Sequence, residues 1–149
     1  MSKQRKEGYK PLVYVCAPYA GNIKQNKKLA KLYAQIVYSL NYMPLTPHFL
    51  FPFLNDNNPK EKYDAMAMDI ILLSKCDEIW IFGDVVSEGM EKELQIAEKW
   101  KKVVRRLYDD EIQRHAEKPE NKNPWDEVKD YFEKVQEFNR VLRESYEEI

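Results

Sequence analysis

Apolar residues along this chain fall into two kinds of segment. Short runs that are mostly apolar and rich in β-branched residues predict strands of a parallel sheet buried on both faces. Four such runs occur: Pro11–Ala17, Met43–Leu45, Glu78–Phe82 and Val103–Leu107. The longer stretches between them predict helices: Asn22–Leu40, Lys60–Ser74 and Gly89–Trp100. The alternation predicts an α/β fold with a doubly wound parallel sheet and right-handed crossovers.

The connection after the second strand, Thr46–Pro59, differs from the others. It is rich in aromatic residues, proline and asparagine, and it is too long for an ordinary strand-to-helix connection. Long loops at this edge of a sheet commonly form lids or pocket walls. We expect His48 and Phe49 to contact a ligand, and Phe51 could stack on a base. A structural hydrogen bond for His48 and plain loop packing for the aromatic residues are the alternatives.

The tail has a different character from the rest of the chain. Asp109–Asn123 is almost entirely charged or polar and predicts a weak helix leading into a linker. Pro124 then opens an amphipathic helix, with apolar residues at helical spacing: Trp125, Val128, Tyr131, Phe132, Val135, Phe138, Leu142 and Tyr146. We therefore predict an α/β domain over residues 1–108 and a helical extension over 109–149. Such a stripe must be covered, which favours a homo-oligomer (dimer or tetramer) over a helix folded back on its own sheet.

Composition excludes several classes of function. The chain has 149 residues, 44% of them hydrophobic, and a formal net charge of -1, so nothing favours nucleic acid or an acidic membrane as a partner. No apolar run approaches membrane-spanning length and the first ten residues lack a signal-peptide core, so we expect a soluble, cytoplasmic protein. Cys16 and Cys76 are expected in the core of a reduced protein. His48 and His115 are too few to build a metal site, and no cofactor is expected.

The stretch Asp77–Ala97 carries most of the candidate chemistry. A buried strand is followed by a polar turn with Ser87 and Gly89, and then by the first turns of a helix that carries Glu93. Ligands of open α/β sheets bind at the carboxyl ends of the strands, where a helix N-terminus favours an anionic group. This order predicts a small-molecule site for a phosphate-bearing ligand. The alternatives are that Ser87 is an ordinary helix cap and that the glutamates only complement the helix dipole.

Asp69 is the single carboxylate in the otherwise apolar helical segment Ala65–Leu73, which predicts that it is partly buried. Burial, or a second carboxylate nearby, raises the pKa of a carboxyl group. Because Asp69 and Glu93 lie on the helices that flank the third strand, we expect them to meet across one pocket at the carboxyl edge of the sheet. Two such carboxylates suit acid, base or nucleophilic work on a glycosidic bond. Structural hydrogen bonds to Asp69 are the alternative.

Four blocks of the sequence resemble an uncharacterised family of bacterial and phage proteins. They are Val13–Asn22 (VYVCAPYAGN), Pro47–Pro52 (PHFLFP), Cys76–Asp84 (CDEIWIFGD) and Ser87–Met90 (SEGM), within a match over Leu12–Leu107. That family is similar to the nucleoside 2-deoxyribosyltransferases and the deoxynucleoside-monophosphate N-glycosidases. The resemblance therefore implies a flavodoxin-like, Rossmann-like sheet and a nucleoside or nucleotide as the small-molecule partner.

The resemblance also implies roles for individual residues. The transferases carry their nucleophilic glutamate in the form small-Gly-x-x-x-Glu-Leu, which Gly89 and Glu93-Leu94 match. Asp69 matches the helix aspartate that orients or protonates the base, and Ser87 matches the phosphate-binding serine of the nucleotide hydrolases. The other ligand contacts implied are Tyr19, Gly21, Asn22, His48, Phe49 and Asp84.

Two departures from the transferases concern the ligand. Their first loop carries a small pair such as Gly-Ser, whereas this chain has the bulkier Pro18-Tyr19-Ala20-Gly21. Their aspartate that grips the sugar hydroxyl has no counterpart here other than Asp84.

Three hypotheses of function follow. The first is an N-glycosidase or 2-deoxyribosyltransferase that acts through a covalent glycosyl-glutamate at Glu93. The second is a non-catalytic module that senses or sequesters a nucleotide-derived signal. The third is a scaffold whose C-terminal helix is the functional surface.

Overall fold

A computed structural model of the chain describes residues 8–19, 21–118 and 136–145. Its elements are β1 (Leu12–Cys16), α1 (Ile23–Ser39), β2 (Met43–Leu45), the short 3₁₀ helix η1 (Pro47–Phe49), α2 (Pro59–Lys75), β3 (Glu78–Phe82), α3 (Glu88–Lys99), β4 (Val103–Leu107) and α4 (Asp109–Ala116). The predicted strands and the first three helices are all present, with ends within one residue of those predicted.

Side-chain caps explain where the three long helices begin. The Asn22 side chain accepts a hydrogen bond from the Gln25 amide (3.1 Å) at the start of α1. The Asn58 side chain accepts from the amides of Lys60 and Glu61 at the start of α2, where Pro59 occupies the first helical position. Ser87 caps α3 in the same way.

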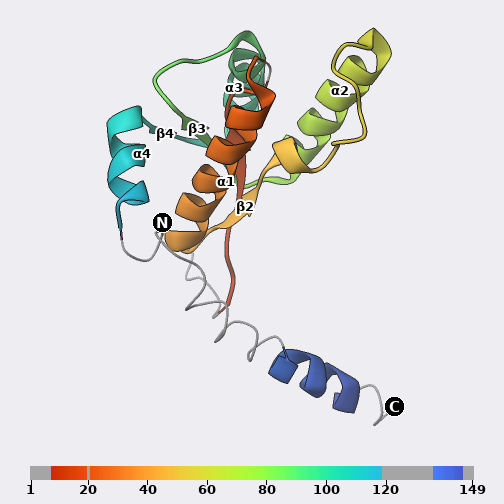
Figure 1. Ribbon diagram of the computed structural model, residues 1–149, viewed down its shortest axis with the longest axis vertical. Helices are drawn as coiled ribbons and strands as arrows, with labels where there is room; N and C mark the ends of the chain where they lie inside the picture. The colour runs from red at the N-terminus through yellow and green to blue at the C-terminus, as the bar shows by residue number, and fades with distance from the viewer. Residues whose placement is uncertain (1–7, 20, 119–135, 146–149) are drawn as a thin grey trace. The chain divides into compact units, whose positions relative to one another are not determined.

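The four strands form one parallel sheet in the order β2-β1-β3-β4 (Figure 1). The two central strands are β1 and β3, with Val15 opposite Trp80 in the register. All five residues of β3 are buried, as expected of a strand covered on both faces. The predicted α/β fold with a doubly wound parallel sheet is therefore confirmed.

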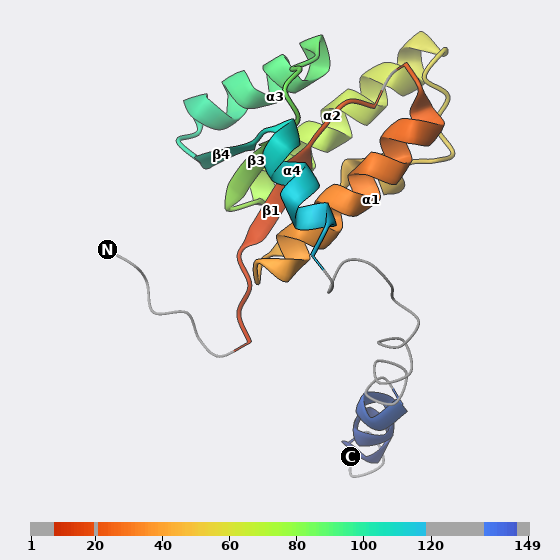
Figure 2. The same ribbon diagram turned by 60° about the vertical axis from the view of Figure 1, so that its left-hand side comes forward.

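Helices cover the sheet on both faces, so the core has two layers (Figure 2). On one face Val13, Val15, Trp80 and Phe82 pack with residues of α1 and α4. On the other face the alternate residues Tyr14, Cys16, Ile79 and Ile81 pack with residues of α2 and α3. The residues of α2 and α3 that face the sheet therefore lie in the same layer as Tyr14 and Cys16 of β1.

The chain divides into two compact units, Met1–His115 and Ala116–Ile149. The division falls after His115 and not after residue 108, because α4 buries Ile112 in the core formed with α1. In the second unit residues 136–145 are helical, with Phe138 and Leu142 exposed. The other members of the predicted apolar stripe lie outside the described residues: Trp125, Val128, Tyr131, Phe132, Val135 and Tyr146.

Candidate functional site

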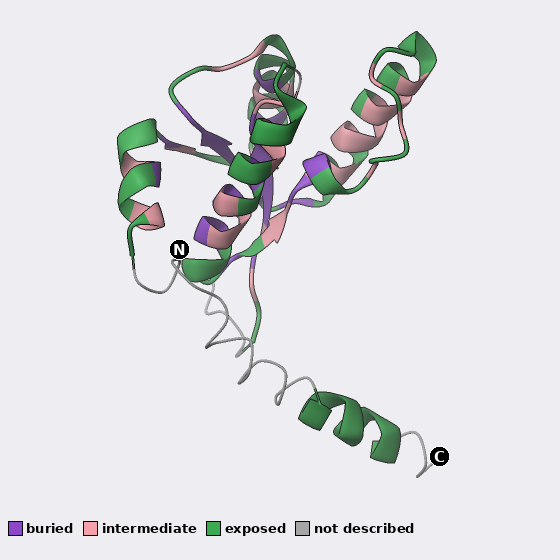
Figure 3. Ribbon diagram, viewed as in Figure 1, coloured by how far each residue is buried: buried purple, intermediate pink, exposed green. Residues whose placement is uncertain are grey.

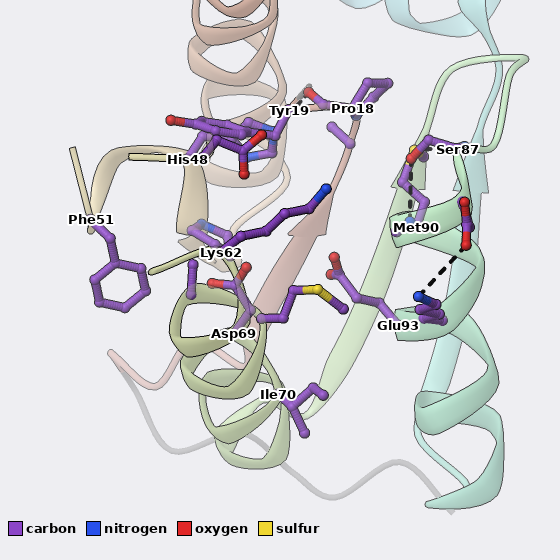
Figure 4. Close-up of a pocket in the computed structure, with 18 of the residues that line it drawn as sticks. Pro18, Tyr19, His48, Phe51, Lys62, Asp69, Ile70, Ser87, Met90 and Glu93 are labelled. Atoms are coloured by element: carbon purple, nitrogen blue, oxygen red, sulfur yellow. Dashed lines mark hydrogen bonds and ion pairs between the residues drawn. The ribbon is translucent and has the colours of Figure 1, made fainter. Parts of the chain in front are cut away.

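A cavity of about 410 Å³ opens at the carboxyl ends of β1, β2 and β3 (Figure 4). Its floor and walls come from the loops that follow these strands and from the facing sides of α2 and α3. Among its lining residues are Tyr14, Pro18, Tyr19, His48, Phe51, Lys62, Met66, Asp69, Ser87, Gly89 and Glu93. This is the edge of the sheet at which ligands of open α/β folds bind.

Glu93 projects into the cavity from the second turn of α3 (Figure 4). Burial raises the pKa of its carboxyl group to about 7, and the charge of Asp69 acts in the same direction. The hydroxyl of Tyr14, which is buried on β1, donates a hydrogen bond to Glu93 and opposes this rise. Burial and the charge of Glu93 also raise the pKa of Cys16, so this residue is a buried neutral thiol beside the site.

Asp69 faces Glu93 from α2, on the opposite wall of the cavity (Figure 4). Burial raises the pKa of its carboxyl group to about 6. Its Oδ1 atom is buried and has no hydrogen-bond partner within the described part of the chain. The predicted convergence of Asp69 and Glu93 in one pocket is confirmed, while their catalytic roles stay a prediction.

Glu78 is a buried carboxylate with a structural role, whereas Asp69 and Glu93 are half-buried. The Oε1 atom of Glu78 accepts hydrogen bonds from Arg105 Nε (2.8 Å) and from the Trp80 indole (3.1 Å), so its charge is paired. By contrast, neither Asp69 nor Glu93 forms an ion pair with another described residue. Partly buried carboxyl groups without an ion pair lower the stability of the folded protein. Such destabilising groups are typical of functional sites, where they are retained for their chemistry.

Ser87 and Gly89 lie where the sequence predicted them, at the start of α3 and at the cavity wall. The Ser87 hydroxyl accepts a hydrogen bond from the Met90 amide (3.3 Å), and the Ser87 amide donates to the sulfur of Met90 (3.4 Å). A Cβ atom added to Gly89 would meet no other atom within 4 Å, so packing does not require glycine here. Ser87 therefore caps α3, and any contact of its side chain with a ligand would be in addition to this role.

His48 and Tyr19 form the wall near the end of β1 (Figure 4). His48 is only 7% exposed, and its Nε2 lies 2.9 Å from the carbonyl oxygen of Pro18, so Nε2 carries the proton and donates. Its ring meets that of Tyr19 edge to face at 5.6 Å. Burial lowers the pKa of His48, which keeps the imidazole neutral at neutral pH. His48 thus ties the loop after β2 to the loop after β1.

Four of the predicted ligand contacts do not line this cavity. Gly21 lies in the turn before α1 with a φ of 95°, and Asn22 uses its side chain to cap that helix. Phe49 is 45% exposed, and Phe51 takes its place in the wall. Asp84 borders a separate hollow of about 130 Å³, and its Oδ1 accepts from the Asp109 amide (2.9 Å).

The structure also adds two residues that the sequence had not singled out. Tyr14 was hidden within an apolar strand, although a tyrosine in the middle of such a strand needs a partner for its hydroxyl and could have been suspected. Lys62 extends from α2 into the cavity (Figure 4), but a lysine in a helix of mixed charges carries no sequence signal of its own.

The residues that the structure describes contain no group of three metal-ligating side chains placed to hold an ion. In the same ranges, no helix is long and apolar enough to cross a bilayer.

Solved structures with a similar fold include a 2-deoxyribosyltransferase from Bacillus psychrosaccharolyticus, with a TM-score of 0.54 and 16% identity over 65% of this chain and 72% of that one. A 2-deoxyribosyltransferase from Leishmania mexicana gives a TM-score of 0.50 and 16% identity, over 66% of this chain and 64% of that one. At this identity the likeness shows the fold, and the expected similarity to these transferases is confirmed at that level.

No curated protein matches the chain in sequence. Residues 11–107, which run from the start of β1 to the end of β4, match a single family over well more than half of the chain. The chain therefore belongs to the family described as "Domain of unknown function (DUF7768)".

Proposed function

We propose that this protein cleaves the N-glycosidic bond of a 2-deoxyribonucleoside or of its 5′-monophosphate. The observation that carries the proposal is the pair Glu93 and Asp69, which face each other across one cavity and form no ion pair with any described cationic residue. Two carboxyl groups on either side of a glycosidic bond can supply a nucleophile and an acid. The similar solved structures are of 2-deoxyribosyltransferases, which supports this chemistry on this fold.

Glu93 is the nucleophile in this proposal. Its ionised carboxylate attacks C1′ of the sugar, a new C–O bond forms, and the bond from C1′ to the base nitrogen breaks, with its electron pair passing to the base. The hydrogen bond from Tyr14 holds the carboxylate in place and favours its ionised form. Tyr14 orients the Glu93 carboxylate, and no such bond from a described residue orients Asp69. Because the pKa of Glu93 (about 7) lies above that of Asp69 (about 6), the reactive form, with Glu93 ionised and Asp69 protonated, is the less populated of the two singly protonated forms of the pair.

Asp69 is the acid in this proposal. In its protonated form it transfers its proton to the departing base, and its raised pKa keeps that proton available near pH 6. Water then attacks C1′ and loses a proton to Asp69, which frees Glu93 and releases 2-deoxyribose, or 2-deoxyribose 5-phosphate where the substrate is the monophosphate. If a second base attacks C1′ in place of water, a new bond from C1′ to the base nitrogen forms and the bond from C1′ to Glu93 breaks. The result is transfer of the sugar instead of hydrolysis.

The rest of the cavity has the size and surface for such a ligand. About 410 Å³ lies within the range typical of small-molecule sites, which are mostly apolar with a few placed polar groups. The apolar part of the lining faces Glu93 and Asp69 from several elements and suits a base and a deoxyribose ring: Tyr19, Pro47, Phe51, Met66 and Ile70.

The experiment is incubation of the purified protein with a panel of 2-deoxyribonucleosides and their 5′-monophosphates, followed by chromatography for the free base. We expect base release by the wild type and a loss of about a thousand-fold or more in Glu93→Gln. Glu98→Gln is the matched control, because Glu98 lies on the same helix but not at the cavity. Base release at an unchanged rate by Glu93→Gln would refute the nucleophile. Tight binding without base release by the wild type would instead indicate a nucleotide-binding module.

A further inference from the structure

We infer that the cavity takes an uncharged deoxynucleoside in preference to its 5′-monophosphate. The inference deepens the proposed function and rests on it, because it concerns the substrate of the same site. It is drawn from the charges around the cavity, from the hydrogen bonds and carboxylates at the start of α3, and from the neutral state of His48.

Carboxylates outnumber cations among the residues that line the cavity in the described part of the chain. Five lining residues are acidic and two are basic, and none is an arginine. The acidic ones are Asp56, Glu61, Asp69, Glu88 and Glu93, and the basic ones are Lys62 and Lys92. Even when Asp69 and Glu93 share one proton, the lining stays negative, and a phosphate would add about two more negative charges to it.

The two lysines do little to offset this excess. Lys92 Nζ lies 3.7 Å from Glu88 Oε1, so its charge is balanced by a carboxylate of the same helix. Lys62 extends into the cavity from α2, where Glu61 precedes it in sequence and also lines the cavity. A phosphate placed near Lys92 would therefore lie near the Glu88 carboxylate, and Lys62 by itself cannot reverse the excess of acidic over basic lining residues.

Several backbone amides at the N-terminus of α3 are already bonded within the chain. The Met90 amide is bonded to the Ser87 hydroxyl, and the Ser87 amide to the Met90 sulfur. Glu88 and Glu91 occupy the first turn, where their negative charges already complement the positive end of the helix dipole. A phosphate at Ser87 would have to approach these two carboxylates.

His48 supplies no positive charge. Burial lowers its pKa, and its Nε2 proton is donated to the Pro18 carbonyl oxygen. What remains for recognition is an apolar and aromatic lining with carboxyl groups that can accept hydrogen bonds from sugar hydroxyls and base amino groups. That chemistry fits a nucleoside whose 5′-hydroxyl is free.

The test compares kcat/KM for each 2-deoxyribonucleoside with that for its own 5′-monophosphate. For the base that is turned over fastest, we expect the nucleoside to be preferred by about ten-fold or more at low ionic strength. The preference should shrink as salt is added, since screening weakens repulsion between partly exposed charges. Glu88→Gln should reduce it about three-fold, and Glu98→Gln, which removes a charge from the same helix away from the cavity, should leave it unchanged.

Equal or better use of the monophosphate would overturn the inference, and Lys62→Gln would then show whether Lys62 is the phosphate contact. A preference that neither salt nor Glu88→Gln alters would also overturn it, because repulsion would not be its cause. If the wild type releases base from neither compound, the proposed function fails, and calorimetric titration of the wild type with both compounds decides the inference separately. Tighter binding of the nucleoside supports it; equal binding, tighter binding of the monophosphate, or no binding of either refutes it.

Discussion

The hydroxyl of Tyr14, in the middle of β1, donates a hydrogen bond to the carboxyl group of Glu93 on α3. Tyr14 is 1% exposed, so this contact joins the centre of the sheet to the cavity. It lowers the pKa of Glu93, whereas burial and the charge of Asp69 raise it. The ionisation of Glu93, the proposed nucleophile, therefore depends on Tyr14, a residue of the central strand β1 that also lines the cavity.

Replacing Tyr14 by phenylalanine should raise the pKa of Glu93 further. We expect a shift of about half to one unit, and a loss of about three- to ten-fold in kcat/KM at pH 6 that becomes smaller at pH 8. Carbon-13 NMR titration of the Glu93 carboxyl group measures the shift without turnover. Tyr33→Phe is the matched control, because Tyr33 is buried on the opposite face of the sheet. An unchanged Glu93 titration in Tyr14→Phe would contradict the role of the hydrogen bond.

The dependence of activity on pH should be bell-shaped, with its maximum between about pH 6 and about pH 7. These limits come from the raised pKa values of Asp69 and Glu93. Below this range both groups are protonated and no nucleophile is available; above it both are ionised and no acid remains. Initial rates of base release from pH 4.5 to pH 9 measure the profile. A rate that keeps rising up to pH 9 would argue against a protonated carboxyl group as the acid.

Glu93→Gln should make the protein more stable at alkaline pH. The folded protein holds the Glu93 proton more tightly than the unfolded chain does, because the pKa is raised from 4.5 to about 7. The stability contributed by that proton is complete below about pH 4.5 and is lost as the pH rises through about 7. Glutamine is neutral throughout, so we expect the variant to gain about 1–3 kcal/mol at pH 8 and almost nothing at pH 4.5.

Urea unfolding of the wild type and of Glu93→Gln at the two pH values checks this prediction. Glu98→Gln serves as the control for removal of an exposed carboxylate from the same helix. Equal stability of all three proteins at pH 8 would mean that burial of Glu93 carries no cost.

The apolar stripe of the C-terminal extension leads us to predict a homo-oligomer, a dimer or a tetramer. Phe138 and Leu142 are exposed on the helix of residues 136–145, and leaving each large apolar side chain in water forgoes about 1.5–3 kcal/mol. Light scattering after size-exclusion chromatography should give at least twice the 17.8 kDa of one chain. A monomer at micromolar concentration contradicts the prediction. An oligomer that persists after deletion of residues 124–149 would assign the assembly to another surface.

The order and the ends of the elements could be predicted because local signals agree with the tertiary fold. Asn22, Asn58 and Ser87 are good helix caps in sequence and act as caps in the structure. Asp69 and Glu93 could be placed together because both lie on helices that adjoin β3, and helices next to one strand share its carboxyl edge.

The details of the cavity could not be predicted in the same way. Whether an odd or an even position of β1 faces α2 and α3 depends on packing of the whole sheet, so Tyr14 had no signal pointing to Glu93. Asp84 follows the carboxyl end of β3, a position typical of a residue that contacts a ligand. In the structure its side chain instead accepts a hydrogen bond from the amide of Asp109 at the start of α4. Phe49 and Phe51 differ by two positions in an irregular loop, where no periodicity distinguishes the exposed ring from the one in the wall.

Helix α2 carries Asp69, yet it is the least anchored wall of the cavity. Of its seventeen residues, all of them described, Leu73 alone is buried, and the helix is exposed or half-buried over nearly its whole length (Figure 3). Segments with few buried contacts open locally at a fraction of the free energy of global unfolding. We therefore expect the amide protons of α2 ahead of Leu73 to exchange with solvent sooner than those of β3. A ligand that touches both Asp69 and Glu93 would slow that exchange, so occupancy of the cavity could be followed as protection of this one helix.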